Sequence, residues 1–340
     1  MVREIFTHVD DVEAPCEEEE EGKGALACLG AWDDVPPSIT GAHHMKLTPK
    51  VQDETHLEIV VGEEEHGRRI DEEHTQVAAS QQPPPPHDED QGGTIGFDKV
   101  LWDTDVMVDK VDGSQYVQFT YHSFDGEEGF PGNVKVQVAY RLTRDMELLV
   151  DMRAIVGNKS TPLNLAQHTY WNLGGHNSGT ILNNSIQIAG DKITLVDGEL
   201  IPTGQLEEVA GTPYDFRRQR VIGSQIDKVT GGYDINYELK GGHTMRIMGG
   251  KDVHFAAKVR DPKSRRAMEV YTNQVGMQFY TSNGLSGVVG KGGAMYGMHD
   301  ALCLETQGFP DAVHHPNFPS VIVPAHHHYH HIMLFRFSLH

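Results

Sequence analysis

The segment from Val134 to Tyr140 places a valine or tyrosine at every second position, with lysine, glutamine and alanine between them. A period of two is the side-chain period of a β-strand that turns one face to a core. Further strands are predicted at residues 146–156, 185–189, 254–259, 267–272 and 331–337. Asp-Gly and Gly-Gly turn words separate these stretches, and no long stretch has the 3.6-residue period of a helix. The sequence therefore predicts an all-β fold, a large antiparallel β-sandwich.

Residues 1–91 differ in composition from the rest of the chain. We interpret the acidic run at Glu17–Gly22 and the proline-rich stretch at Ala78–Gln91 as loops or disorder. Short strands such as His56–Val61 are expected between them. The predicted organisation is a divergent, partly disordered segment over residues 1–91 and a β-sandwich over residues 92–340. The ordered parts of the first segment are expected to join the sandwich as one domain.

Composition bears on partners and compartment. The chain has 49 acidic and 28 basic residues and a formal net charge of −21, which would repel the phosphates of a nucleic acid. Three cysteines, Cys16, Cys28 and Cys303, make a poor disulfide framework and are typical of a reducing compartment. No apolar run of about 18 residues is present to span a bilayer, and residues 1–8 lack the apolar core of a secretory signal. We expect a cytoplasmic protein without nucleic-acid or membrane partners, either a monomer or a weak dimer.

Two polar blocks far apart in the sequence each surround one titratable side chain with apolar and aromatic neighbours. Thr161–Gly175 contains His168, and Cys303–Asp311 contains Glu305. A histidine and a carboxylate that share a pocket can exchange protons with a ligand in both directions near neutral pH. Each residue also has a purely structural interpretation, His168 as a core histidine bonded to backbone and Glu305 as part of a hydrogen-bond network.

The two blocks and several other sequence motifs resemble those of the aldose 1-epimerase family, also called galactose mutarotases. The other motifs, in chain order, are Gly96–Trp102, Asp125–Gly132, Gly211–Phe216, Gly231–Asp234 and Gln274–Thr281. The resemblance runs from about Gly92 to the C-terminus. It implies a galactose mutarotase-like supersandwich that interconverts the α and β anomers of a free hexose of the galactose or glucose class. It implies neither a cofactor nor a metal.

The resemblance also implies roles for the two titratable residues. In the family, the glutamate of the Leu-Glu-Thr-Gln motif is the general base, and the histidine of the His-Thr-Tyr-Trp-Asn motif is the general acid. These residues correspond here to Glu305 and His168. Glu305 ends the apolar strand predicted at Ala301–Glu305, where partial desolvation should raise its pKa. We expect His168 on a strand that shares a face with residues 164 and 166, and a sugar ring between the two side chains.

Three further residues are candidate sugar contacts. Asp234 follows Gly231 and Gly232, so it could bind hydroxyls from a turn tip or simply stabilise the turn. Gln278 resembles the substrate-binding glutamine of the family, and its amide can donate to one hydroxyl while accepting from the next. Trp171 could present a flat surface to the sugar or serve as a core aromatic residue.

The N-terminal region departs from the family pattern at two positions. Gln91, in the motif Asp90–Gly93, occupies the position of the histidine in the family's Leu-His-Gly-Gly motif. The side chain of Gln91 cannot titrate. Arg69 is the nearest match to the arginine of the family's Asn-Arg-Ile motif. These departures fit an epimerase of lower activity, an enzyme for another substrate, or a degraded N-terminal region that leaves the sandwich incomplete.

Two alternative functions follow from the same observations: a non-catalytic sugar-binding protein on this scaffold, or an isomerase of a non-sugar hemiacetal. The histidine-rich tract His326–His331 could bind zinc or nickel. No carboxylate or cysteine lies inside the tract to complete a site, so we interpret it as a solvated turn and expect no metal.

Overall fold

The computed structural model describes residues 45–53, 56–63, 95–110 and 113–339. The chain separates into two compact units, Met1–Gln76 and Val77–His340. In the first unit, β1 (Met45–Asp53) and β2 (His56–Glu63) pair as an antiparallel hairpin. The strand expected at His56–Val61 is therefore found as part of β2. The loops expected at Glu17–Gly22 and Ala78–Gln91 lie outside the described residues.

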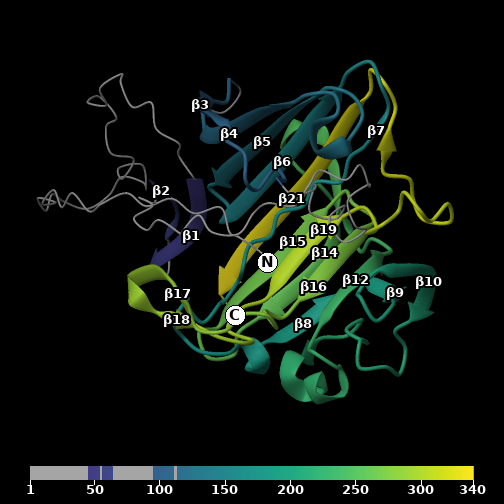
Figure 1. The fold of residues 1–340 in the computed structure, drawn as a ribbon. Coiled ribbons are helices and arrows are strands. Elements are labelled where there is room, and N and C mark those ends of the chain that lie inside the picture. The colour runs from purple at the N-terminus through teal and green to yellow at the C-terminus, as the bar shows by residue number, and fades with distance from the viewer. Residues whose placement is uncertain (1–44, 54–55, 64–94, 111–112, 340) are drawn as a thin grey trace, which may run out of the picture. The chain divides into compact units, whose positions relative to one another are not determined.

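Ten strands of the second unit form one antiparallel sheet (Figure 1). The order across the sheet is β11-β8-β14-β15-β21-β6-β5-β4-β3, and β13 pairs with β14. The strands are β3 (Asp103–Val108), β4 (Gln115–Ser123), β5 (Val134–Thr143), β6 (Glu147–Val156), β8 (Ser185–Ile188), β11 (Arg220–Val221), β13 (Thr244–Arg246), β14 (Asp252–Arg260), β15 (Arg266–Thr272) and β21 (His328–Leu339).

A second antiparallel sheet has the order β10-β9-β12-β16-β19. Its strands are β9 (Gly190–Val196), β10 (Pro202–Glu208), β12 (Asp234–Leu239), β16 (Gly276–Tyr280) and β19 (Cys303–Gln307). Two short pairs complete the strands in the described part of this unit: β7 (Thr161–Pro162) with β20 (Ile322–Val323), and β17 (Val288–Val289) with β18 (Met295–Tyr296).

The helices of the described part of the chain are three-residue 3-10 turns. They are η2 (Glu127–Gly129), η3 (Ile181–Asn183), η4 (Ile222–Ser224), η5 (Ile226–Lys228), η6 (Met248–Gly250) and η7 (Lys291–Gly293). Among these residues no helix has the length and apolar character needed to cross a membrane. The prediction of an all-β, antiparallel fold is confirmed, and the strands predicted from period-two patterns correspond to β5, β6, β8, β14, β15 and β21.

Alternation within single strands shows why these segments are strands. Along β6, the side chains of Leu148, Val150, Met152, Ala154 and Val156 are all buried, while the residues between them are half-buried or exposed. A strand directs successive side chains to opposite faces, so this pattern turns one face of β6 to the core. Burial of such side chains is the main favourable contribution to folding.

The two large sheets pack against each other through the faces that carry Thr272 and Thr306. The hydroxyl of Thr272 on β15 lies 3.0 Å from the hydroxyl of Thr306 on β19, and both side chains are buried. Because successive side chains of β19 alternate between faces, Glu305 points to the opposite face. The packing of the sandwich thus leaves the outer face of the five-stranded sheet for Glu305.

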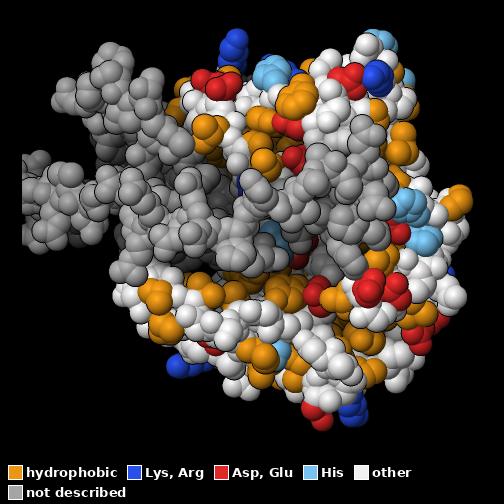
Figure 2. All heavy atoms as spheres, viewed as in Figure 1, with side chains coloured by type: hydrophobic (Ala, Val, Ile, Leu, Met, Phe, Trp, Pro, Cys, Tyr) orange, Lys and Arg blue, Asp and Glu red, His pale blue; other side chains and the backbone are white. Residues whose placement is uncertain are grey.

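The described surface carries charges of both signs. On the face drawn in Figure 2, acidic side chains lie among hydrophobic ones, and lysine and arginine side chains lie apart from one another at the margins.

Candidate active site

The outer face of the five-stranded sheet carries two rows of polar side chains. In each row the residues are directly opposite one another on β12, β16 and β19, and opposite residues of antiparallel strands point to the same face. The first row is Asn236, Gln278 and Glu305, and the second is Asp234, Tyr280 and Cys303. Strand register therefore gathers residues from three separate parts of the chain.

His168 reaches this face from another segment. Residues 163–170 have no regular secondary structure, so the strand expected around His168 is wrong. The segment runs from β7 to an isolated bridge between Trp171 and Leu302, whose backbones exchange hydrogen bonds of 2.8 and 2.9 Å. This bridge attaches the segment next to the start of β19 and brings His168 over the sheet.

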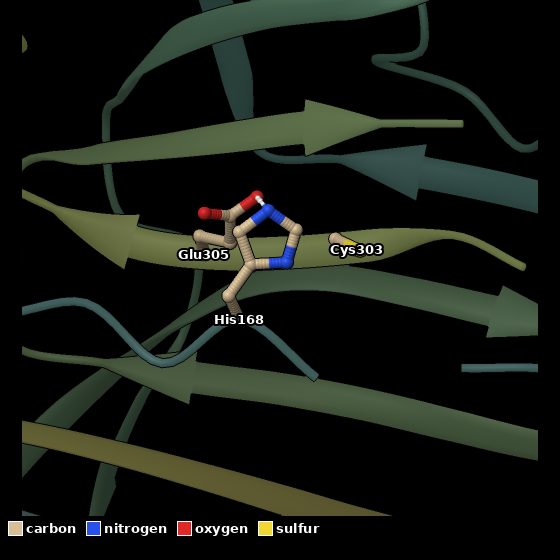
Figure 3. A group of neighbouring side chains, drawn as sticks. All are labelled: His168, Cys303 and Glu305. Atoms are coloured by element: carbon tan, nitrogen blue, oxygen red, sulfur yellow. Dashed lines mark ion pairs between the residues drawn. The ribbon is translucent and has the colours of Figure 1, made fainter. Parts of the chain in front are cut away.

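The imidazole of His168 and the carboxyl group of Glu305 face each other directly. Nε2 of His168 lies 3.5 Å from Oε1 of Glu305, and Figure 3 shows both side chains and Cys303 meeting over β19. At this distance no sugar ring fits between the two groups, contrary to the expectation. Tyr170 stacks on the imidazole with ring centroids 5.0 Å apart, and Tyr280 lies edge-on at 6.1 Å.

Burial sets the protonation of this pair. Glu305 is 8% exposed, and desolvation raises the pKa of its carboxyl group to about 8, with a further increase from the charge of Asp234. Desolvation lowers the pKa of His168. Both shifts favour neutral groups, so near neutral pH the pair holds one dissociable proton, mainly on Glu305. The pair is therefore better described as a shared-proton contact than as a salt bridge.

Asp234 and Gln278 form a hydrogen-bonded pair beside Glu305. Nε2 of Gln278 donates to Oδ1 of Asp234 at 2.7 Å. Asp234 is the first residue of β12, so the structure places it at a strand start instead of a turn tip. Desolvation raises the pKa of Asp234, and the hydrogen bond from Gln278 opposes that shift. This arrangement also fixes the amide of Gln278, with its oxygen left to accept another hydrogen bond.

Several buried polar atoms of the site have no hydrogen-bond partner among the described residues. They are Oε1 of Gln278, Nδ1 of His168 and both side-chain atoms of Asn236. Buried polar groups are nearly always paired with protein, water or ligand. Their concentration around one row of the sheet is what a polyhydroxylated ligand or ordered water would satisfy.

Trp171 belongs to the core and does not offer a free face to a sugar. Its side chain is 6% exposed, and its ring packs against Phe335 at 5.1 Å and Phe337 at 5.6 Å. Of its two interpretations, the packing favours the core aromatic residue. Arg69 and Gln91 lie outside the described residues, so their relation to the site stays a prediction.

Sequence reasoning missed four residues that surround the Glu305–His168 pair: Tyr170, Tyr280, Cys303 and Asn236. Tyr280 and Cys303 each lie two positions from a residue that was identified, Gln278 and Glu305. On a strand, residues two apart share a face, so the period of two contained the signal. The same signal was present for Asn236, which lies two positions from Asp234 on β12.

Metal-binding potential lies at the same place. Among the described residues, one group of at least three histidine, cysteine and acidic side chains has potential ligand atoms within 4.8 Å of one another, namely His168, Cys303 and Glu305 (Figure 3). An ion there would occupy the lone pairs that proton transfer requires.

The tract His326–His331 is only partly a solvated turn. His326, His327 and His328 are exposed, but β21 begins at His328 and the side chain of His331 is completely buried. Its imidazole is thus part of the core packing.

Comparisons with known proteins assign the chain to a family. The profile of the aldose 1-epimerase family matches residues 91–336. Galactose mutarotase from Homo sapiens is 44% identical over 250 residues, which cover 73% of this chain and 68% of that protein. Aldose 1-epimerase from Escherichia coli (strain K12) is 36% identical over 233 residues, covering 67% of this chain and 63% of that protein.

Solved structures show the same fold. An aldose epimerase homologue from C. elegans has a TM-score of 0.61 at 23% identity, covering 73% of this chain and 71% of that one. A galactose 1-epimerase from Lactobacillus acidophilus has a TM-score of 0.60 at 24% identity, covering 72% and 68%. With a family match that includes both His168 and Glu305, the chain belongs to the aldose 1-epimerase family.

Proposed function

We propose that the protein is an aldose 1-epimerase in which Glu305 and His168 transfer the protons of ring opening and closing. The substrate is a free hexose of the galactose or glucose class. The observation that carries the proposal is the carboxyl–imidazole contact of 3.5 Å on the outer face of the sheet. General acid and base groups must lie within hydrogen-bond reach of the protons they move, and this pair offers both at one place.

The contact distance suits the chemistry of the anomeric centre. The anomeric hydroxyl and the ring oxygen are bonded to the same carbon, so an acid and a base side by side can reach both from one side of the sugar. Ionised Glu305 removes the proton from the anomeric hydroxyl while protonated His168 donates to the ring oxygen. The bond from the anomeric carbon to the ring oxygen then breaks and leaves an open-chain aldehyde. Rotation about the adjacent carbon–carbon bond and reversal of both transfers close the other anomer.

The pair starts each cycle with its single proton, and the two placements of that proton are tautomers of one state. A sugar hydroxyl that enters the site provides the relay between the two groups. Because the second half of the reaction returns both protons, the enzyme ends unchanged. Over one cycle the enzyme therefore neither gains nor loses a proton.

Hydroxyl binding is assigned to Asp234 and Gln278. The carboxylate of Asp234 accepts hydrogen bonds, and the free oxygen of Gln278 accepts another from a neighbouring hydroxyl. The site is buried enough that such bonds are stronger than in water. Arg69 and Gln91 remain candidates for further contacts, and the sparse cysteines support a cytoplasmic location.

The pH profile of kcat/KM is expected to be bell-shaped. Above about 8 the last proton leaves the Glu305–His168 pair, and activity falls. At acidic pH a second proton binds the pair, and since burial lowers the pKa of His168, this limb lies below the usual histidine value of 6.5. Polarimetry across the pH range, after subtraction of the spontaneous rate, measures both limbs. A profile that is flat from pH 5 to 9, within about twofold, would contradict the shared-proton pair.

The same assay separates the alternatives. Fresh α-D-glucose and α-D-galactose are each followed by optical rotation with and without protein, and binding of each sugar is measured by calorimetry. Acceleration of either rotation change supports the epimerase. Binding of a sugar without acceleration supports a non-catalytic sugar-binding protein.

A further inference from the structure

A buried histidine links the two segments that carry the proposed acid and base. His331 lies on β21, in the ten-stranded sheet, and its side chain is completely buried. Its Nδ1 lies 3.0 Å from the carbonyl oxygen of Leu165, and its Nε2 lies 2.8 Å from the hydroxyl of Thr306. Leu165 is in the irregular segment three positions before His168, and Thr306 directly follows Glu305.

The chemistry of the partners fixes the direction of both bonds. Burial lowers the pKa of His331 to about 3, so its imidazole is neutral at working pH. A carbonyl oxygen can only accept, so Nδ1 carries the hydrogen and donates to Leu165. Nε2 then accepts from the hydroxyl of Thr306. A neutral histidine in this tautomer satisfies both neighbours, and both ring nitrogens are used.

Thr306 is itself held from the other side. Its oxygen lies 3.0 Å from the hydroxyl of Thr272, whose single hydrogen is shared between Thr306 and the carbonyl oxygen of Ile332, 2.8 Å away. The hydroxyl network thus anchors β19 to β15 and β21, beneath Glu305. The imidazole of His331 extends that network to the segment above the sheet.

Asn164, the residue before Leu165, also attaches the segment to the chain that follows β19. The side chain of Asn164 accepts from the backbone nitrogen of Gly308 at 2.7 Å and donates to its carbonyl oxygen at 3.3 Å. Asn164 is exposed to solvent, whereas the imidazole of His331 is completely buried. Buried hydrogen bonds are more costly to break, so His331 is a stiffer attachment than Asn164.

We propose that His331 is a positioning residue, which holds the Leu165–His168 segment against β19 and so sets the distance between His168 and Glu305. This role rests on the proposed function. Misplacement of a catalytic group by about 1 Å can cost about 100-fold in rate. Loss of His331 therefore lowers kcat more than it changes KM, since the hydroxyl-binding residues on β12 and β16 stay in place.

Three substitutions at His331 separate its two bonds. His331→Asn keeps a donor near the position of Nδ1, for Leu165, and His331→Gln keeps an acceptor that reaches Thr306. His331→Phe removes both bonds while it fills the space. Thr306→Val removes the hydroxyl without a large change in volume, and it provides the test if the phenylalanine variant does not fold.

Met333→Ala is the matched control. Met333 lies two positions along β21 and is also completely buried, but it is a hydrophobic residue of the core. Its truncation destabilises the protein without cutting the link between the two segments. Urea unfolding gives the folded fraction of every variant, so that kcat is expressed per folded molecule.

The expected result is a fall in kcat of about 10- to 100-fold for His331→Phe, with KM within about threefold of the wild type. His331→Asn and His331→Gln each recover part of the loss, Thr306→Val falls between them and wild type, and Met333→Ala keeps wild-type kcat. The proposal is overturned if His331→Phe and Thr306→Val both keep kcat within about twofold. It is also overturned if Met333→Ala loses as much as His331→Phe.

A second readout does not need activity. The imidazole ¹⁵N resonances of His168, assigned by their loss in His168→Gln, should shift in His331→Phe and stay unchanged in Met333→Ala. Unchanged resonances in His331→Phe would overturn the positioning role. If wild-type protein fails to accelerate mutarotation while these resonances shift, the proposed function fails and the positioning of His168 by His331 stands.

Discussion

Glu305→Gln is expected to lower kcat/KM for mutarotation by about 10²–10⁴-fold. The amide keeps the shape of the side chain beside His168, whose Nε2 lies 3.5 Å from the carboxyl oxygen in the wild type, but it cannot take a proton from the anomeric hydroxyl. Because the carboxyl group is buried, no bulk water is positioned to replace it as a base. The measurement is the optical rotation of fresh α-D-glucose or α-D-galactose at equal protein concentration.

Glu269→Gln is the control for that loss. It makes the same change on β15, where Glu269 pairs with Lys258 at 3.0 Å and has no place on the outer face of the five-stranded sheet. Its activity should match that of wild type. Full activity in Glu305→Gln would refute the assignment of the base.

The same Glu305→Gln variant is expected to be more stable than wild type, increasingly so as pH rises. The pKa of Glu305 is about 8 in the folded protein and near its ordinary value of 4.5 when unfolded. Between these values the unfolded chain loses a proton that the folded protein keeps, so wild-type stability falls with pH. At about 1.4 kcal/mol per pKa unit, the upper limit of this loss is roughly 5 kcal/mol at pH 8 and above.

Urea unfolding of both proteins at pH 4, 6 and 8 checks this dependence. The variant should equal wild type near pH 4, where both side chains are neutral, and exceed it at pH 8. Glu269→Gln should show the opposite sign, because the pKa of Glu269 is lowered through its hydrogen bonds to Lys258 and Tyr271 against the opposing effect of burial. If the free energies of unfolding of Glu305→Gln and wild type differ by the same amount at all three pH values, the folded protein does not raise the pKa of Glu305, and the account of its burial is wrong.

The sheet strands were predictable because their burial is local. A period of two marks one buried face, and β5, β6 and β15 lie where that pattern lies. Glu305 was placed on a strand for the same reason, within an apolar run that continues as β19. Desolvation then follows from the apolar neighbours, which is why the direction of its pKa shift was also expected.

The segment around His168 was not predictable as irregular, because distant groups satisfy its backbone. The backbone nitrogen of Leu165 donates to the hydroxyl of Tyr329 at 3.2 Å, and its carbonyl oxygen accepts from the imidazole of His331. Both partners are more than 160 positions away in sequence. A local pattern of side chains contains no trace of such bonds.

The histidine tract shows the same limit. Its composition suggests a uniform solvated turn, yet the alternation of β21 buries His331 completely while His328 is exposed. The contact distance between His168 and Glu305 was equally hidden, since it depends on contacts between remote segments, the Trp171–Leu302 bridge and the bonds of His331 among them. These features follow from pairing between remote segments.

Comparison of kcat/KM for the double variant His168→Gln, Glu305→Gln with both single variants tests the central claim most directly. If the two groups act as one unit that shares a proton, the double variant should be no more than a few-fold worse than the poorer single variant. Losses that multiply, with the double variant reaching the product of the two single losses, would show that the two side chains act independently.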